Sequence, residues 1–125
     1  MKMPSMTPIE PGDVLLVPFP YTDQSAVKQR PAVVLSSKAY NLTHPDLILA
    51  PITGRFGGND ETTLTAWQQA GLAKPSAVKP LLASFEASLV RRKLGRLEPK
   101  DLVAVRALFA RILGLSRARS PRRTS

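Results

Sequence analysis

The chain has 125 residues, enough for one domain with its own hydrophobic core, and 43% of them are hydrophobic. It contains no cysteine, which excludes disulfides and thiolate metal sites, and no apolar run approaches the length of a membrane span. Lysine and arginine number 18 against 9 acidic residues, so the net charge is +9. We expect a polyanion, nucleic acid above all, as the partner of so basic a chain; the alternative is that the charge only keeps the protein in solution.

The two ends differ from the middle in composition. Residues 1–11 contain three prolines and no apolar pattern, and we expect a flexible lead without a signal sequence. Residues 116–125 hold four arginines and no acid, which predicts a basic tail too polar to fold alone. Without this tail, 14 basic and 9 acidic residues still give +5, so the folded part is basic as well. This leaves residues 12–115 as one domain, which we expect in the cytoplasm.

Short apolar or alternating runs between proline, glycine and polar residues predict strands over residues 14–17, 30–37, 47–50, 61–67 and 77–85. Proline cannot donate a ladder hydrogen bond. We therefore expect the first strand to end, or to lie at a sheet edge, at Pro18, and the third strand to stop at Pro51. Residues 38–46 read as a connection with about one helical turn, and residues 86–97 fit a strand or a helix equally well.

The clearest helix spans residues 98–114, with Pro99 at its first position, Asp101 in its first turn and Gly114 as a stop. Apolar residues recur along it at three- and four-residue spacing, at Leu102, Val105, Leu108, Phe109 and Ile112. This stripe predicts packing against the strands. Several short strands and one late helix, without β–α alternation, predict a mainly β fold: a small barrel or sheet with the C-terminal helix packed on it.

Familiar catalytic motifs are absent. The single histidine, His44, precedes Pro45 in a connection and reads as a solvated loop residue. The sequence has no zinc-hydrolase, Walker or dinucleotide-binding motif and no G-x-S-x-G elbow. Zinc hydrolysis and nucleotide binding through these motifs are therefore unsupported, and the sequence names no metal and no cofactor.

Five short motifs in order resemble the MazF/PemK family, the toxins of bacterial toxin–antitoxin pairs. They are "GDVLLVPFP", "KQRPAVVLS", "LILAPITG", "GLAKPSAVK" and "LVRRKLGRL", followed by the final helix. The resemblance implies an SH3-like β barrel that forms a homodimer and binds single-stranded RNA and an acidic antitoxin. It also implies a metal-independent endoribonuclease, in which the ribose 2′-hydroxyl attacks the adjacent phosphate. The family's catalytic arginine and threonine correspond to Arg30 and Thr53.

Physical chemistry suits these two residues to that role. Negative charge grows on the non-bridging phosphate oxygens during 2′-hydroxyl attack. Arg30 offers a permanently charged fork for two oxygens, and Pro31 restricts its backbone. Thr53, at the end of an apolar strand, offers a short hydroxyl donor with little conformational freedom. By pattern alone, a threonine that bonds local backbone is the simpler interpretation, and only the resemblance favours catalysis.

Supporting RNA contacts are predicted for residues near these motifs: Lys28, Gln29, Ser76, Lys79, Phe19 and Tyr21. The two aromatic rings would stack on unpaired bases, with ordinary packing as the alternative. Lys74 belongs to the same motif as Ser76. A basic cluster at Arg91, Arg92, Lys93 and Arg96 would steer RNA or simply be solvated.

The general base is left open by the sequence. Asp23 and Glu61 are the nearest acids, and both read as solvated loop carboxylates; Lys79 is followed by Pro80 and two leucines, where some relatives have an acid. Two other functions compete with the toxin interpretation. One is a barrel that binds RNA or DNA without catalysis, and the other is a module that binds a partner peptide.

Overall fold

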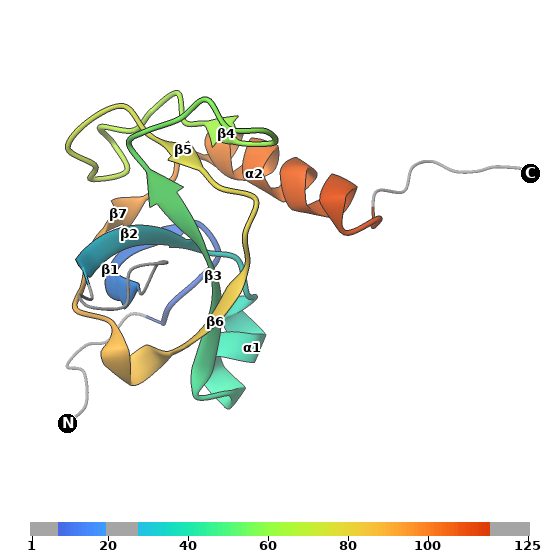
Figure 1. Ribbon diagram of the computed structural model, residues 1–125. Helices are drawn as coiled ribbons and strands as arrows, with labels where there is room; N and C mark the ends of the chain where they lie inside the picture. The colour runs from blue at the N-terminus through green and yellow to red at the C-terminus, as the bar shows by residue number, and fades with distance from the viewer. Residues whose placement is uncertain (1–7, 20–27, 116–125) are drawn as a thin grey trace, which may run out of the picture.

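The computed structural model describes residues 8–19 and 28–115, which form a curled antiparallel sheet with a C-terminal helix (Figure 1). The strands are β1 (Asp13–Phe19), β2 (Lys28–Val34), β3 (Asp46–Thr53), β4 (Thr62–Thr63), β5 (Ala77–Val78), β6 (Ala83–Glu86) and β7 (Arg92–Arg96). The helices are α1 (Lys38–Thr43), the 3-10 turn η1 (Ala87–Leu89) and α2 (Pro99–Ile112). The mainly β half-barrel with a final helix confirms the predicted fold class.

The strands follow the order β4-β5-β3-β2-β1-β7, and β6 also pairs with β3. β3 is the longest strand and the centre of the sheet. It pairs with β2 along one side, while its other side is shared by β6 over its first half and β5 over its second. This change of partner bends the sheet, so α1 lies beside one end of β3 and α2 beside β4 and β5 at the other (Figure 1).

Alternation along the strands divides the core into two clusters. One lies under α2 and contains Val14, Val33, Ala50, Ile52, Val78, Val105, Leu108 and Phe109. The other fills the opposite, curled side of the sheet and contains Leu15, Val17, Phe19, Ala32, Val34, Leu47 and Leu49. Because side chains alternate across a strand, consecutive residues of β1, β2 and β3 enter different clusters. The two faces of the sheet are therefore chemically distinct, which matters for the site described below.

Two prolines lie inside strands that we expected them to end. β1 runs through Pro18 to Phe19, and β3 runs through Pro51 to Thr53. Arg91 N–H donates to the carbonyl of Leu16 at 2.8 Å, so Pro18, two residues on, faces the same side but beyond the end of β7. The first strand thus does lie at an edge there. Pro51 lies where the partner of β3 changes from β6 to β5. Its carbonyl still accepts from Lys79 N–H at 3.0 Å, and the Lys79 carbonyl, to which proline cannot donate, accepts instead from Leu81 N–H at 2.8 Å.

The remaining predicted strands and helices are present, but several differ in length from the prediction. The strand expected over residues 61–67 is reduced to β4, and the one expected over 77–85 is split at Pro80 into β5 and β6. Residues 86–97 form η1 and then β7. Along α2, Val105, Leu108 and Phe109 are buried as predicted, but Ile112 is 41% exposed at the helix end. In the described part of the chain, no helix is long and apolar enough to cross a membrane.

Candidate functional site

Arg30 and Thr53 lie on adjacent strands and on the same face of the sheet. In the β2–β3 ladder, Ala32 is opposite Pro51. Continuing this register by two residues along both strands places Arg30 opposite Thr53. On its other side Arg30 pairs with Val17, which belongs to the core cluster on the curled side, so Arg30 and Thr53 both belong to that side. The sheet itself therefore brings together the cation and the hydroxyl named from the sequence.

The next row of the sheet adds a lysine and a carboxylate. Lys79 N–H donates to Pro51 O at 3.0 Å, which extends the β3–β5 register and puts the Lys79 side chain on the face of Thr53. The β4–β5 register likewise places Glu61 opposite Lys79. Their charged groups lie 4.0 Å apart, Nζ to Oε2. We call the surface formed by Arg30, Thr53, Lys79 and Glu61 the cationic face.

Lys74 reaches the same place from the loop before β5. A Cβ built on Gly54 would lie 3.0 Å from Lys74 Nζ and still nearer to its Cε, so the lysine stem crosses the backbone directly after Thr53. A side chain at position 54 would displace the end of this lysine. Ser76 supports the arrangement, because its buried hydroxyl donates to Lys74 O at 2.8 Å. Lys74 thus lies against the residue that follows Thr53, while Lys79 pairs with Glu61.

The polar atoms of Arg30 and Thr53 are held in defined positions. Arg30 is half-buried and its Nε is buried within the protein. The hydroxyl of Thr53 accepts a hydrogen bond from Arg55 N–H at 3.0 Å and donates to Arg55 O at 3.2 Å. This is the local bonding that the pattern alone predicts for a strand-end threonine. A neighbouring anion could take over the donated bond, since the hydroxyl proton is free to rotate.

The remaining predicted contacts fall into different environments. Lys28 and Gln29 are exposed on β2, next to Arg30. Phe19 is 5% exposed and its ring stacks on Phe85 with a centroid distance of 5.8 Å, which favours the packing role over base stacking. Ser76 is buried, so its hydroxyl would have to leave Lys74 O to touch RNA. Tyr21 and Asp23 lie outside the described residues.

Sequence reasoning misjudged Glu61 and passed over Arg55. Glu61 was expected to be a solvated loop carboxylate, but its side chain is only 8% exposed. Its Oε1 accepts hydrogen bonds from the N–H groups of Gly57 at 3.1 Å and Gly58 at 3.3 Å. Arg55 follows Thr53 by two residues and is exposed. Side chains alternate along a strand, so continuing β3 by two residues could have pointed to Arg55. The place of Glu61 opposite Lys79 follows only from the pairing of the strands.

Two buried acids stabilise the domain away from the cationic face. Asp13 begins β1 and is buried, with Arg96 Nη1 at 2.7 Å and Lys93 Nζ at 3.2 Å. Half of the predicted basic cluster on β7 is therefore engaged with this carboxylate, while Arg91 and Arg92 are exposed.

Asp101 on α2 accepts hydrogen bonds from Thr65 and Ala66, which lie 36 and 35 residues earlier. Burial alone would raise the pKa of Asp101. The hydrogen bonds donated by the N–H groups of Ala66 and Thr65 and by the Thr65 hydroxyl, with the charge of Lys100, outweigh burial and lower that pKa below its ordinary value. The carboxylate therefore joins α2 to the loop after β4.

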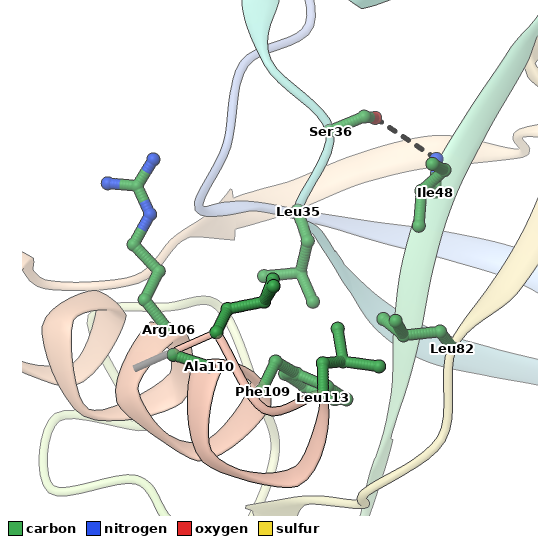
Figure 2. Close-up of a pocket in the computed structure, with 9 residues that line it drawn as sticks. Leu35, Ser36, Ile48, Leu82, Arg106, Phe109, Ala110 and Leu113 are labelled. Atoms are coloured by element: carbon green, nitrogen blue, oxygen red, sulfur yellow. Dashed lines mark hydrogen bonds between the residues drawn. The ribbon is translucent and has the colours of Figure 1, made fainter. Parts of the chain in front are cut away.

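An apolar pocket of about 280 Å³ lies elsewhere, between the end of α2 and the sheet (Figure 2). Leu35, Leu82, Phe109 and Leu113 line it, and Arg106 points away from this apolar lining. Ser36 at its edge accepts a hydrogen bond from Ile48 N–H at 3.0 Å. The described residues contain no group of three or more acidic or histidine side chains placed to hold a metal ion. The chemistry that the cationic face offers is anion binding by fixed cations and a hydroxyl.

Comparisons with known proteins identify the family. A family model described as PemK-like, MazF-like toxin of type II toxin–antitoxin system matches residues 10–113. A MazE–MazF structure (Form III) from Deinococcus radiodurans is 28% identical, with a TM-score of 0.68 over 87% of this chain and 98% of that one.

Two further structures share the fold. A mycobacterial endoribonuclease in complex with its cognate antitoxin is 15% identical, with a TM-score of 0.71 over 90% of this chain and 99% of that one. The Mycobacterium tuberculosis toxin MazF-mt6 is 20% identical, with a TM-score of 0.67 over 84% of this chain and 99% of that one. No curated protein sequence matched. Because the family model spans nearly the whole described domain, the chain belongs to the PemK/MazF family of type II toxins.

Proposed function

We propose that the protein is an endoribonuclease toxin that cleaves single-stranded RNA at the cationic face. The observation that carries this proposal is the β2–β3 register, which puts Arg30 opposite Thr53 when it is continued two residues beyond the Ala32–Pro51 pair, with Lys79 in the next row. Family membership supports the same activity, and two structures of similar fold are described as endoribonucleases. The net charge of +9 supports a polyanionic substrate.

In the proposed reaction, the 2′-hydroxyl of one ribose attacks the adjacent phosphorus, and the bond to the 5′-oxygen of the next nucleotide breaks. The products are a 2′,3′-cyclic phosphate and a 5′-hydroxyl. Arg30 grips the non-bridging oxygens as their negative charge grows, and Thr53 donates its hydroxyl proton to one of them. Both groups sit on strands, so little reorganisation is needed when the charge develops. The 2′-hydroxyl releases its proton to solvent water and the departing 5′-oxygen takes up a proton from it, while Arg30 and Thr53 stabilise the charge on the phosphate. The proposed step requires no metal or cofactor.

Regulation is proposed to come from an acidic antitoxin. The similar chains from Deinococcus and from a mycobacterium are in complexes with MazE or a cognate antitoxin. An acidic peptide would compete with RNA for Arg30, Lys74 and Lys79, because both ligands bind the same cations. We also propose that the active form is a homodimer, which analytical ultracentrifugation of the purified protein would test, and that it acts in the cytoplasm, which cell fractionation would test.

The test is cleavage of a 5′-labelled unstructured RNA in EDTA. We expect 5′-hydroxyl ends on the downstream products, and no cut where the nucleotide 5′ to the scissile bond is a 2′-deoxynucleotide. Arg30→Ala and Thr53→Val should each lower the cleavage rate roughly 10²- to 10³-fold, the usual effect of losing one transition-state donor. Arg106→Ala is the matched control, since Arg106 is exposed on α2, which packs on the other face of the sheet. RNA binding without cleavage by the wild-type protein would contradict the proposal and favour a passive nucleic-acid-binding barrel.

A further inference from the structure

Glu61 is an acid on a surface that otherwise gathers cations. Its side chain is 8% exposed and points to the same face as Lys79, opposite it across the β4–β5 ladder. On a face that binds RNA, a carboxylate repels the ligand and weakens binding. Its presence there therefore needs another reason, and its hydrogen bonds supply one.

Those hydrogen bonds close the loop between β3 and β4. Oε1 of Glu61 accepts from Gly57 N–H at 3.1 Å and from Gly58 N–H at 3.3 Å. A Cβ built on Gly58 would lie 2.9 Å from Oε2, so a glycine at this position lets the carboxylate reach the backbone. Gly57 has a φ of +123°, a conformation that L side chains rarely adopt. The loop is thus shaped to wrap around this one carboxylate.

The same loop begins at Thr53. The Thr53 hydroxyl exchanges hydrogen bonds with Arg55 N–H and Arg55 O, at 3.0 and 3.2 Å. A loop that is closed at Gly57 and Gly58 fixes Arg55, and the N–H of Arg55 in turn fixes the position of the Thr53 hydroxyl oxygen, whose proton can turn from Arg55 O to a phosphate. The second oxygen of Glu61 faces Lys79 Nζ at 4.0 Å, on the other side of the same row.

We infer that Glu61 is a positioning residue for RNA cleavage: it holds the β3–β4 loop closed and thereby holds the Thr53 hydroxyl oxygen in place beside the phosphate. This inference rests on the proposed endoribonuclease function and adds a residue that acts through Thr53 without touching RNA. The essential property of Glu61 is an acceptor oxygen for Gly57 and Gly58. Its negative charge is not essential, since an amide oxygen accepts the same two hydrogen bonds.

The test measures kcat and KM for Glu61→Ala and Glu61→Gln beside the wild type. We expect Glu61→Ala to lower kcat roughly 10- to 100-fold, the scale of a misplaced catalytic group, without raising KM, because a repulsive charge leaves the face. Glu61→Gln should keep kcat within about threefold of the wild type, which is rescue by the conservative variant.

Two further variants separate loop closure from charge and from folding. Gly58→Ala keeps the charge of Glu61 but pushes its carboxylate aside, and should also lower kcat. Asp60→Asn removes a charge from the same loop, where Asp60 faces Arg111 at 3.9 Å on the exposed surface, and should leave kcat within about twofold of the wild type. Thermal unfolding of each variant shows whether the domain is intact at the assay temperature.

The outcomes are distinguishable. A wild-type protein that cuts no RNA refutes the proposed function, and this inference with it. An active wild type with an equally active Glu61→Ala variant refutes the inference alone. The inference is also overturned if Glu61→Gln falls as far as Glu61→Ala, or if Glu61→Ala raises KM at constant kcat, since the role would then be charge or direct binding.

Discussion

Replacing Asp101 by asparagine should unfold the domain more readily, because the carboxylate is a buried cap for a distant loop. It is 2% exposed and accepts from Thr65 N–H at 3.0 Å, from the Thr65 hydroxyl at 2.9 Å and from Ala66 N–H at 2.9 Å. Asparagine keeps one acceptor oxygen but turns an NH₂ group toward one of these donors. Hydrogen bonds to a charged group contribute roughly 1.5–3 kcal/mol each.

At least one such bond is lost and one donor is left buried without an acceptor. We therefore expect Asp101→Asn to lower the free energy of unfolding at pH 7 by about 2–4 kcal/mol. The measurement is urea unfolding followed by circular dichroism. Asp46→Asn is the matched control, since Asp46 has only Ser84 Oγ at 3.4 Å and should change stability by less than about 0.5 kcal/mol.

The pH dependence gives this prediction a second, independent readout. The pKa of Asp101 is lower in the folded protein than in the unfolded chain, so its stabilisation is complete above the unfolded value of about 3.9. It is lost as the pH falls through the lower, folded-state value. The stability difference between wild type and Asp101→Asn should therefore shrink as the pH is lowered below about 4. A difference that stays constant down to pH 2.5, or one below about 0.5 kcal/mol at pH 7, would refute the reasoning.

Three other changes test the packing and the charge. Gly95→Ala should lower the free energy of unfolding in urea by more than about 2 kcal/mol, because the added Cβ would lie 2.5 Å from Ala70 O. A variant as stable as the wild type would show that β7 and the loop at Ala70 can move apart. Phe19→Ala should lower the free energy of unfolding by about 3–5 kcal/mol, because the ring is buried and stacked on Phe85. A loss below about 1 kcal/mol would instead favour stacking of Phe19 on an RNA base. Deleting residues 116–125 removes four arginines and should weaken RNA binding and flatten its salt dependence, with unchanged binding as the contrary result.

The sequence predicts the elements of this fold better than their ends. Pro99 and the apolar spacing define α2 because helix starts and amphipathic stripes are local properties. The continuation of β3 through Pro51 is not local: it depends on β6 ending and β5 beginning beside that residue. Asp101 illustrates the same limit, since its position in the first turn is readable but its partner Thr65 is 36 residues away.

For the candidate site too, the sequence indicated individual residues but not which of them are neighbours. Arg30 and Thr53 were named through the five motifs and a physical argument about phosphate charge, but nothing in the sequence states that they are neighbours. The β2–β3 register makes them so when it is continued beyond the Ala32–Pro51 pair. The registers of β3, β4 and β5, continued in the same way, add Lys79 and Glu61 to the same face. Glu61 looked like a solvated loop acid because its hydrogen-bond partners are backbone N–H groups, which carry no sequence signal.

The central claim is that Arg30 and Thr53 act on one phosphate, and a double-mutant cycle on RNA cleavage tests it most directly. Rates would be measured for Arg30→Lys, Thr53→Val and the double variant on one RNA substrate in EDTA. Groups that stabilise the same transition state lose their effect together, so the double variant should be little slower than the slower single variant. Rate losses that multiply independently, or a Thr53→Val variant as active as the wild type, would contradict the account.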